Sequence, residues 1–334
     1  MKRYNDISLK SFHTFGVDLK APCLIEIDSI DDIYQLKYDG VFQKSFYVLG
    51  GGSNVLFLNI PEVVLKINIK GIEIAKQNEE NVWITVKAGE EWDAFVQYCV
   101  ENNFGGVENL SLIPGTAGAA PVQNIGAYGM EIKDSLESLK AINLNDFTVK
   151  DFSNQECRFA YRNSFFKNKE NRHWIILETT YKLTKYNHRF VLNYGNISSA
   201  LNNRQITLQA IRDMVIQQRT SKLPDVKLLG NAGSFFKNPY ISLSKFEELK
   251  AIFPSVPSFQ ADSNNIKIPA AWLIEQSGLK GFRMNNVGIY EKQPLVIVNY
   301  GNATTKEILD FSDFIIKTVK EKFDITLERE VNIV

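Results

Sequence analysis

The chain has 334 residues, of which 44% are hydrophobic and 23% charged, a composition typical of a globular protein of roughly two domains. Thirty-eight Lys and Arg residues balance thirty-eight Asp and Glu residues, so the formal net charge is zero and no global field would attract nucleic acid or an anionic membrane. We therefore expect neither nucleic acid nor a membrane as a partner.

The N-terminal segment gives no sign of export. Lys2, Arg3, Asp6 and Lys10 interrupt its apolar residues, so no apolar signal-peptide core is present. We expect a cytoplasmic protein.

Cysteine and histidine are too few and too scattered for a disulfide framework or a metal site. The cysteines lack any Cys-x-x-Cys pair, and no histidine stands beside another plausible ligand. We expect reduced, mostly buried thiols and no bound metal. The residues are Cys23, Cys99, Cys157, His13, His173 and His188.

A glycine run follows the first clear strand signal. Residues 46–49 have the composition of a buried strand and lead into Gly-Gly-Gly-Ser-Asn at residues 50–54. Successive N–H groups of such a run can point toward one position and form a nest for phosphate. The run does not fit a Rossmann fingerprint, because strand-like residues 55–58 follow it, and the chain contains no P-loop. A tight turn between strands is the alternative.

Strand and helix signals then alternate. Residues 82–87 are typical of a strand, and the apolar positions of residues 92–100 repeat with helical spacing. Further helices are expected over residues 208–222, from Pro269 onward, and after a capping box of Thr304 and Glu307. This order indicates an α+β fold.

Residues 109–130 contain no charged side chain and would be long enough to span a bilayer. Repeated glycine and proline exclude a membrane helix, and the polar side chains would be unsatisfied in lipid. Small residues with neutral amides and hydroxyls suit a large, partly apolar cofactor. A core segment that binds no ligand is the alternative.

The last nine residues, 326–334, alternate between apolar and polar. We expect a strand with Leu327, Val331 and Ile333 on one face and with Glu328 and Glu330 on the other. On an exposed strand these two carboxylates would simply aid solubility.

Two further residues are candidates for chemistry. Ser234 lies between a glycine-rich turn and two phenylalanines, and it is not a hydrolase nucleophile, because Phe236 stands where that motif needs glycine. It is better suited to donate a proton. Arg162 lies in an aromatic setting and could hold a carboxylate through two parallel hydrogen bonds, although a surface arginine would give the same pattern.

Seven motifs in this order resemble a known family almost end to end. The chain is similar to the flavin-dependent UDP-N-acetylenolpyruvoylglucosamine reductases of bacterial cell-wall synthesis, and within them to the longer subclass that has a tyrosine-bearing loop. The motifs lie at residues 13–18, 49–56, 110–129, 161–164, 230–239, 271–276 and 327–331.

The resemblance implies an FAD-binding fold of the vanillyl-alcohol-oxidase type, built from two lobes and a C-terminal α+β domain that binds the substrate. We expect the first lobe at residues 1–65 with a return of the chain at 320–334, the second lobe at 66–215 and the substrate domain at 216–319. The protein is expected to be a monomer.

The resemblance also implies the reaction. Hydride passes from NADPH to FAD and then to the enolpyruvyl group of UDP-N-acetylglucosamine enolpyruvate, giving UDP-N-acetylmuramate. By motif position, Arg162 and Glu330 meet the substrate carboxylate, and Ser234 protonates the α-carbon. We expect burial to raise the pKa of Glu330, because an ionised carboxylate would repel the substrate.

Binding residues follow from the same motifs. The cofactor residues are Gly50, Gly51, Gly52, Ser53, Asn54, Pro114, Gly115, Thr116, Gly118, Ala119, Asn124, Gly126 and Ala127. The substrate residues are Tyr194, Lys222, Asn238 and Gln293.

Two alternatives compete with this function. Another flavin oxidoreductase of the same fold would not need a trio that protonates an enediolate. A non-catalytic protein that binds a sugar nucleotide would not need Arg162, Ser234 and Glu330 together.

Overall fold

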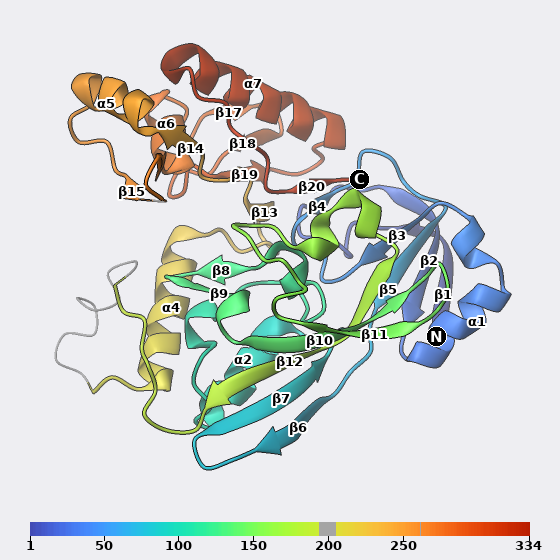
Figure 1. Cartoon of the computed structure of the whole chain (residues 1–334). Coiled ribbons are helices and arrows are strands. Elements are labelled where there is room, and N and C mark those ends of the chain that lie inside the picture. The colour runs from blue at the N-terminus through green and yellow to red at the C-terminus, as the bar shows by residue number, and fades with distance from the viewer. Residues whose placement is uncertain (194–204, 261) are drawn as a thin grey trace. The chain divides into compact units, whose positions relative to one another are not determined.

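The computed structural model describes residues 1–193, 205–260 and 262–334 (Figure 1). The chain forms two compact units, and each contains several separate stretches of sequence. Unit 1 comprises residues 1–7, 21–51 and 61–221, and unit 2 comprises residues 8–20, 52–60 and 222–334. The expected α+β class is confirmed, whereas the expected division into three parts stays a prediction.

The first sheet belongs mainly to unit 1 and has the order β1-β2-β5-β3, in which β2, β5 and β3 run parallel. Its strands are β1 (Lys2–Ser8), β2 (Lys20–Ile27), β5 (Val63–Ile67) and β3 (Phe46–Leu49). Helix α1 (Ile30–Tyr38) begins at a Ser29 capping box and buries Ile33 and Leu36 in the same core as Ile25 and Leu65. The strand expected at residues 46–49 is confirmed.

The second sheet of unit 1 is antiparallel and has the order β11-β10-β12-β7-β6. Helix α2 (Trp92–Glu101) buries its apolar face against it, and the rings of Trp92 and Phe95 pack on Tyr181 at 5.6 and 5.0 Å. The predictions for residues 82–87 and 92–100 are confirmed. The strands are β11 (Val149–Ser153), β10 (Leu136–Asn143), β12 (Trp174–Thr184), β7 (Asn81–Lys87) and β6 (Ile72–Gln77).

The uncharged segment at residues 109–130 is not one long helix. It contains a 3-10 turn, Ala120–Gln123, and strand β8 (Gly126–Ala127), which pairs with β9 (Met130–Glu131). Helix α4 (Leu208–Lys222) ends unit 1 and matches its expected range. No helix in the described part of the chain is long and apolar enough to cross a membrane.

Unit 2 contains an antiparallel sheet in the order β13-β19-β18-β17, a smaller sheet in the order β14-β16-β15, and a parallel pair of β20 and β4. Helices α5 (Leu243–Ile252), α6 (Ala270–Gln276) and α7 (Thr305–Phe323) share one apolar core with these strands. The strands are β13 (Gly230–Ser234), β19 (Val296–Asn299), β18 (Val287–Ile289), β17 (Arg283–Met284), β14 (Tyr240–Ser242), β16 (Asn265–Lys267), β15 (Phe259–Gln260), β20 (Asn332–Ile333) and β4 (Val55–Leu56).

Local signals set two helix starts in unit 2. The Thr304 hydroxyl accepts the Glu307 N–H at 3.2 Å, and the Glu307 carboxylate accepts the Thr304 N–H at 2.7 Å, which is the expected capping box of α7. Helix α6 begins one residue after Pro269, as expected.

The predicted strand over residues 326–334 is wrong in length. Leu327 and Val331 are buried and Glu328 is exposed, as expected, but Ile333 is only half-buried, and the only named strand is β20, over the last part of the segment. The segment first pairs antiparallel with Phe236, through Arg329, and then parallel with β4. Because it changes partner, no continuous ladder forms.

Buried Asn299 joins the segment at residues 8–20 to the antiparallel sheet of unit 2. Its Nδ2 donates to the Phe15 carbonyl at 2.9 Å, and its Oδ1 accepts the N–H groups of Gly301 at 2.8 Å and Ala303 at 3.2 Å. A buried side chain that satisfies three backbone groups is costly to remove.

We expect Asn299→Ala to lower the free energy of unfolding by about 2 kcal/mol, because it leaves these groups unpaired. Thermal or urea unfolding followed by circular dichroism measures the change. Asn264→Ala, at an exposed side chain of the same unit, is the control and should have little effect. Equal stability of the two variants would contradict the role of Asn299.

Candidate functional site

The two glycine-bearing segments of unit 1 touch each other. A Cβ atom on Gly51 would lie 2.7 Å from the Gly115 Cα, and one on Gly50 would lie 2.8 Å from the Ala119 Cβ and 2.9 Å from the Thr116 Oγ1. Real Cβ contacts are essentially never this short. The expected nest and the uncharged segment therefore meet in unit 1 because residues 50 and 51 have no side chains.

The N–H groups at this contact are available to a ligand. Within the described ranges, neither Gly50 nor Gly51 donates its N–H to a protein acceptor. Two consecutive unpaired N–H groups at a strand end suit the phosphate oxygens of a dinucleotide. The residues present thus fit a diphosphate-bearing cofactor at this position.

Gly52 is the first residue of its stretch of unit 2 and is tightly packed. Its φ is +66°, and an added Cβ would lie 2.0 Å from the Phe12 carbonyl oxygen. The Gly52 carbonyl accepts the Thr14 N–H at 3.0 Å, and the buried Thr14 hydroxyl has no partner among the described residues. Thr14 is not among the residues predicted for the site, although it lies in the motif at residues 13–18.

Helix α2 and the turn before it contact the uncharged segment. The Trp92 indole donates to the Leu110 carbonyl at 2.9 Å, and the Trp92 backbone N–H donates to the Gly115 carbonyl at 3.1 Å. A Cβ on Gly118 would lie 2.4 Å from the Ala88 Cβ, so this residue must also be small. Pro114 and Thr116 lie between these anchors.

Asn124 is fully buried, and the protein itself uses both polar atoms of its side chain. Its Nδ2 donates to Glu131 at 2.9 Å and to the Ala160 carbonyl at 3.1 Å, while its Oδ1 accepts the Lys133 N–H at 3.2 Å. A contribution of Asn124 to cofactor binding would therefore come from its backbone, which is left-handed at φ +47°.

Arg162 lies against the uncharged segment. One guanidinium nitrogen donates to the Gly126 carbonyl at 2.7 Å, and the other lies 3.8 Å from the Glu131 carboxylate. The guanidinium also stacks over the Tyr161 ring at 5.1 Å. Ala127 continues the strand that begins at Gly126. The structure thus brings a predicted catalytic residue beside predicted cofactor residues within unit 1.

Ser234 and Glu330 are brought together within unit 2. Ser234 ends β13, and the next residue, Phe235, is fully buried. The Glu330 N–H donates to the Phe235 carbonyl at 2.8 Å, so the chain at residue 330 runs beside the end of β13. The Asn54 amide holds the Glu330 carbonyl at 3.3 Å. Ser53 is the residue before Asn54 in the chain.

The predicted substrate residues fall at ends of elements. Lys222 is exposed at the end of α4, and Gln293 is half-buried in the turn before β19. The Asn238 Oδ1 accepts the N–H of Ala270, the first residue of α6, at 2.9 Å. Tyr194 lies outside the described residues.

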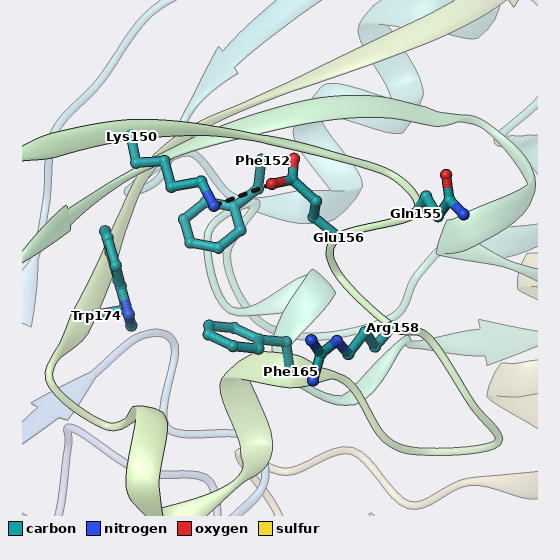
Figure 2. Close-up of a pocket in the computed structure, with 7 residues that line it drawn as sticks. All are labelled: Lys150, Phe152, Gln155, Glu156, Arg158, Phe165 and Trp174. Atoms are coloured by element: carbon teal, nitrogen blue, oxygen red, sulfur yellow. Dashed lines mark ion pairs between the residues drawn. The ribbon is translucent and has the colours of Figure 1, made fainter.

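A separate pocket of about 520 Å³ lies in unit 1 and contains none of the predicted site residues (Figure 2). Lys150 and Glu156 of this pocket form an ion pair with an N–O distance of 2.9 Å. Figure 2 marks this ion pair with a dashed line. No group of three or more His, Cys, Asp or Glu side chains in the described ranges could hold a metal ion. The pocket is lined by Lys150, Phe152, Gln155, Glu156, Arg158, Phe165 and Trp174.

Comparison with known proteins shows the family of the chain. Residues 224–334 match the C-terminal domain of UDP-N-acetylenolpyruvoylglucosamine reductase, and residues 26–153 match an FAD binding domain. A UDP-N-acetylenolpyruvoylglucosamine reductase of Flavobacterium johnsoniae is 46% identical over 338 residues and covers 100% of both chains. One of Porphyromonas gingivalis is 43% identical over 330 residues and covers 98% of this chain and 97% of the relative.

A solved structure shows the same fold. The crystal structure of UDP-N-acetylenolpyruvylglucosamine reductase from Thermus caldophilus gives a TM-score of 0.68 and covers 99% of this chain and 98% of that chain. The two sequences are 23% identical over this region. The FAD-binding fold expected from the motifs is confirmed.

We expect Gly51→Ala to weaken FAD binding by about tenfold, because its Cβ would push the two glycine segments apart. Release of flavin from the diluted protein, followed by flavin fluorescence, measures the affinity. Gly40→Ala is the control, since it adds strain at a left-handed residue but would contact only the Gln43 side chain, at 3.7 Å. Equal affinities of Gly51→Ala and the unmodified protein would contradict the assignment.

Proposed function

Because the chain belongs to the family of UDP-N-acetylenolpyruvoylglucosamine reductases, we propose that Arg162, Ser234 and Glu330 perform its chemistry. The protein is an FAD- and NADPH-dependent oxidoreductase of peptidoglycan synthesis, which reduces UDP-N-acetylglucosamine enolpyruvate to UDP-N-acetylmuramate. The observation that carries the assignment of residues is the placement of Arg162 on the carbonyl of Gly126, inside the segment expected to line the flavin.

The hydride of NADPH would reach the enolpyruvyl substrate through bound FAD. We propose that the N–H groups of Gly50, Gly51 and Gly52 bind its diphosphate, together with Ser53 and Asn54, because the first two N–H groups have no protein acceptor in the described chain. The neutral segment that contains Pro114, Gly115, Thr116, Gly118, Ala119, Asn124, Gly126 and Ala127 would cover the flavin ring.

Arg162 and Glu330 would stabilise the charge that develops on the substrate carboxylate. Hydride addition to the β-carbon of an enolpyruvyl group places negative charge on that carboxylate as an enediolate. A guanidinium can hold it through two parallel hydrogen bonds. A protonated Glu330 would donate one more, without the repulsion that an ionised carboxylate would cause.

Ser234 would deliver the proton that completes the reduction at the α-carbon. Its backbone is held on both sides, by the pairing of β13 with β19 and by the buried Phe235, whose N–H donates to the Leu295 carbonyl at 2.8 Å. A hydroxyl held in this way can act as a general acid at a fixed position. No nucleophilic attack is required of it.

The remaining substrate contacts and the organisation of the chain complete the proposal. Lys222, Asn238, Gln293 and Tyr194 would bind the diphosphate and sugar of the substrate. We propose an FAD-binding part of two lobes, over residues 1–65 and 66–215, with the substrate domain at 216–319 and a return of the chain at 320–334; the two separate sheets of unit 1 support the two lobes. We propose a monomer that works in the cytoplasm.

The visible absorption spectrum of the purified protein tests the function. Flavin bands should bleach with anaerobic NADPH and return with UDP-N-acetylglucosamine enolpyruvate. Flavin bands that bleach with an alcohol or a sugar and return only with oxygen would indicate another oxidoreductase of the fold. If NADPH does not bleach the flavin, the protein would be a non-catalytic protein that binds a sugar nucleotide.

We expect Ser234→Ala to leave the reduction of the flavin by NADPH within about twofold of normal and to slow its reoxidation by the enolpyruvyl substrate by at least about a hundredfold, since only the second step needs this proton. Anaerobic stopped-flow absorbance measures both steps. Ser255→Ala, at an exposed loop residue of the same unit, should change neither step. Equal losses in both steps would refute the role.

We expect Glu330→Gln to remove the alkaline limb of the pH profile for flavin reoxidation. A carboxyl that must be protonated loses activity as the pH rises through its pKa, whereas a glutamine stays neutral and can still donate a hydrogen bond. Glu328→Gln is the matched control, because Glu328 is exposed and pairs with Lys237. An unchanged alkaline limb in Glu330→Gln would contradict the proposal.

A further inference from the structure

Leu112 has an unusual backbone conformation just before the cofactor residues. Its φ is +58°, in the left-handed region that leucine rarely adopts. Side chains bind the peptide groups on both sides of its Cα. The Leu112 N–H donates a hydrogen bond to the Asp93 Oδ1 at 2.5 Å, and the Leu112 carbonyl accepts one from the Arg219 Nε at 3.2 Å. Pro114, Gly115 and Thr116 follow two to four residues later.

Asp93 also forms a bidentate ion pair with Arg212. The distances are 2.7 Å to Oδ1 and 3.0 Å to Oδ2, and the Arg212 side chain is only 7% exposed. One carboxylate on α2 therefore binds both the turn at Leu112 and helix α4. All four residues belong to unit 1.

The charge of this carboxylate is kept despite its burial. Burial alone would raise the pKa of Asp93, but the hydrogen bonds from Arg212 and the Leu112 N–H outweigh it, and the pKa lies below its usual value. An ionised acceptor makes a stronger hydrogen bond to a backbone N–H than a neutral one. Asp93 is thus suited to hold a strained turn at neutral pH.

We propose that Asp93 is a positioning residue for the flavin: by fixing Leu112 in the left-handed conformation, it sets the path of residues 114–116 before FAD binds. This inference rests on the proposed role of Pro114, Gly115 and Thr116 in holding the cofactor. A preset loop pays less ordering entropy on binding than a loop that must first adopt the turn. Arg219 fixes the same turn from its carbonyl side.

A purely structural role would be that Asp93 only ties α2 to α4 through Arg212. The two roles respond differently to glycine at position 112, because glycine adopts positive φ without the steric cost that leucine has. Leu112→Gly would therefore restore the turn in the absence of Asp93 but could not replace the ion pair with Arg212.

The test is the affinity of the purified holoenzyme for FAD, from flavin fluorescence on serial dilution, together with visible circular dichroism of the bound flavin. We expect Asp93→Ala to weaken binding by about tenfold and to alter the flavin dichroism, and Asp93→Ala/Leu112→Gly to return within about threefold of Leu112→Gly alone. Asp93→Asn, which keeps an oxygen for the Leu112 N–H, should lose less affinity than Asp93→Ala.

Asp213→Ala is the matched control. Asp213 is an exposed carboxylate on α4, paired with Gln209 at 2.7 Å, and its removal should leave FAD affinity unchanged. Wild-type affinity in Asp93→Ala would overturn the inference. So would failure of Leu112→Gly to restore binding.

Failure of the underlying cofactor assignment gives a different pattern. If Gly51→Ala and Asp93→Ala both bind FAD normally, then the contact of the two glycine segments does not hold the cofactor. If Gly51→Ala loses affinity and Asp93→Ala does not, then the assignment stands and only the positioning role of Asp93 is refuted. Neither readout requires turnover by Ser234 or Glu330.

Discussion

The close approach of two backbones at Gly51 and Gly115 is the constraint on which the rest of unit 1 depends. A single Cβ atom at Gly51 would lie 2.7 Å from the opposing Cα, so the two segments meet only where side chains are missing. The same contact leaves the N–H groups of Gly50 and Gly51 without protein acceptors in the described chain. Both donors therefore stay open to a ligand such as the diphosphate proposed above.

Hydrogen bonds to backbone carbonyls, and not contacts with one another, position the residues proposed for chemistry. Arg162 is anchored on the Gly126 carbonyl, within the neutral segment, and Glu330 is anchored through its own N–H on the carbonyl beside Ser234. Each anchor joins parts of the chain that are distant in sequence. Such contacts depend on the whole unit, so the positions of these three side chains depend on much of the fold.

Much of this could be predicted from the sequence, because its signals are local. The helix that starts at the capping box of Thr304 and the strand at residues 46–49 depend only on neighbouring residues. The length of the last strand was not predictable, because the segment changes partner between Phe236 and β4. Thr14 and Asp93 were also missed, since their importance lies in an unpaired hydroxyl and a distant N–H that no spacing rule reveals.

Charged side chains from other parts of unit 1 contact the neutral segment. Residues 109–130 carry none, yet Asp93, which is paired with Arg212, accepts the Leu112 N–H, and Arg219 donates to the Leu112 carbonyl. A charged side chain on the inner surface would have to be desolvated whenever a flat, partly apolar ring covered it, at a large cost in free energy. The ion pair of Asp93 and Arg212 avoids that cost, because each charge keeps its own partner whether or not the ring is present. The absence of charge in this stretch and the ion pair that supports its turn are therefore two parts of one solution: a neutral segment held in place by a carboxylate that lies outside it.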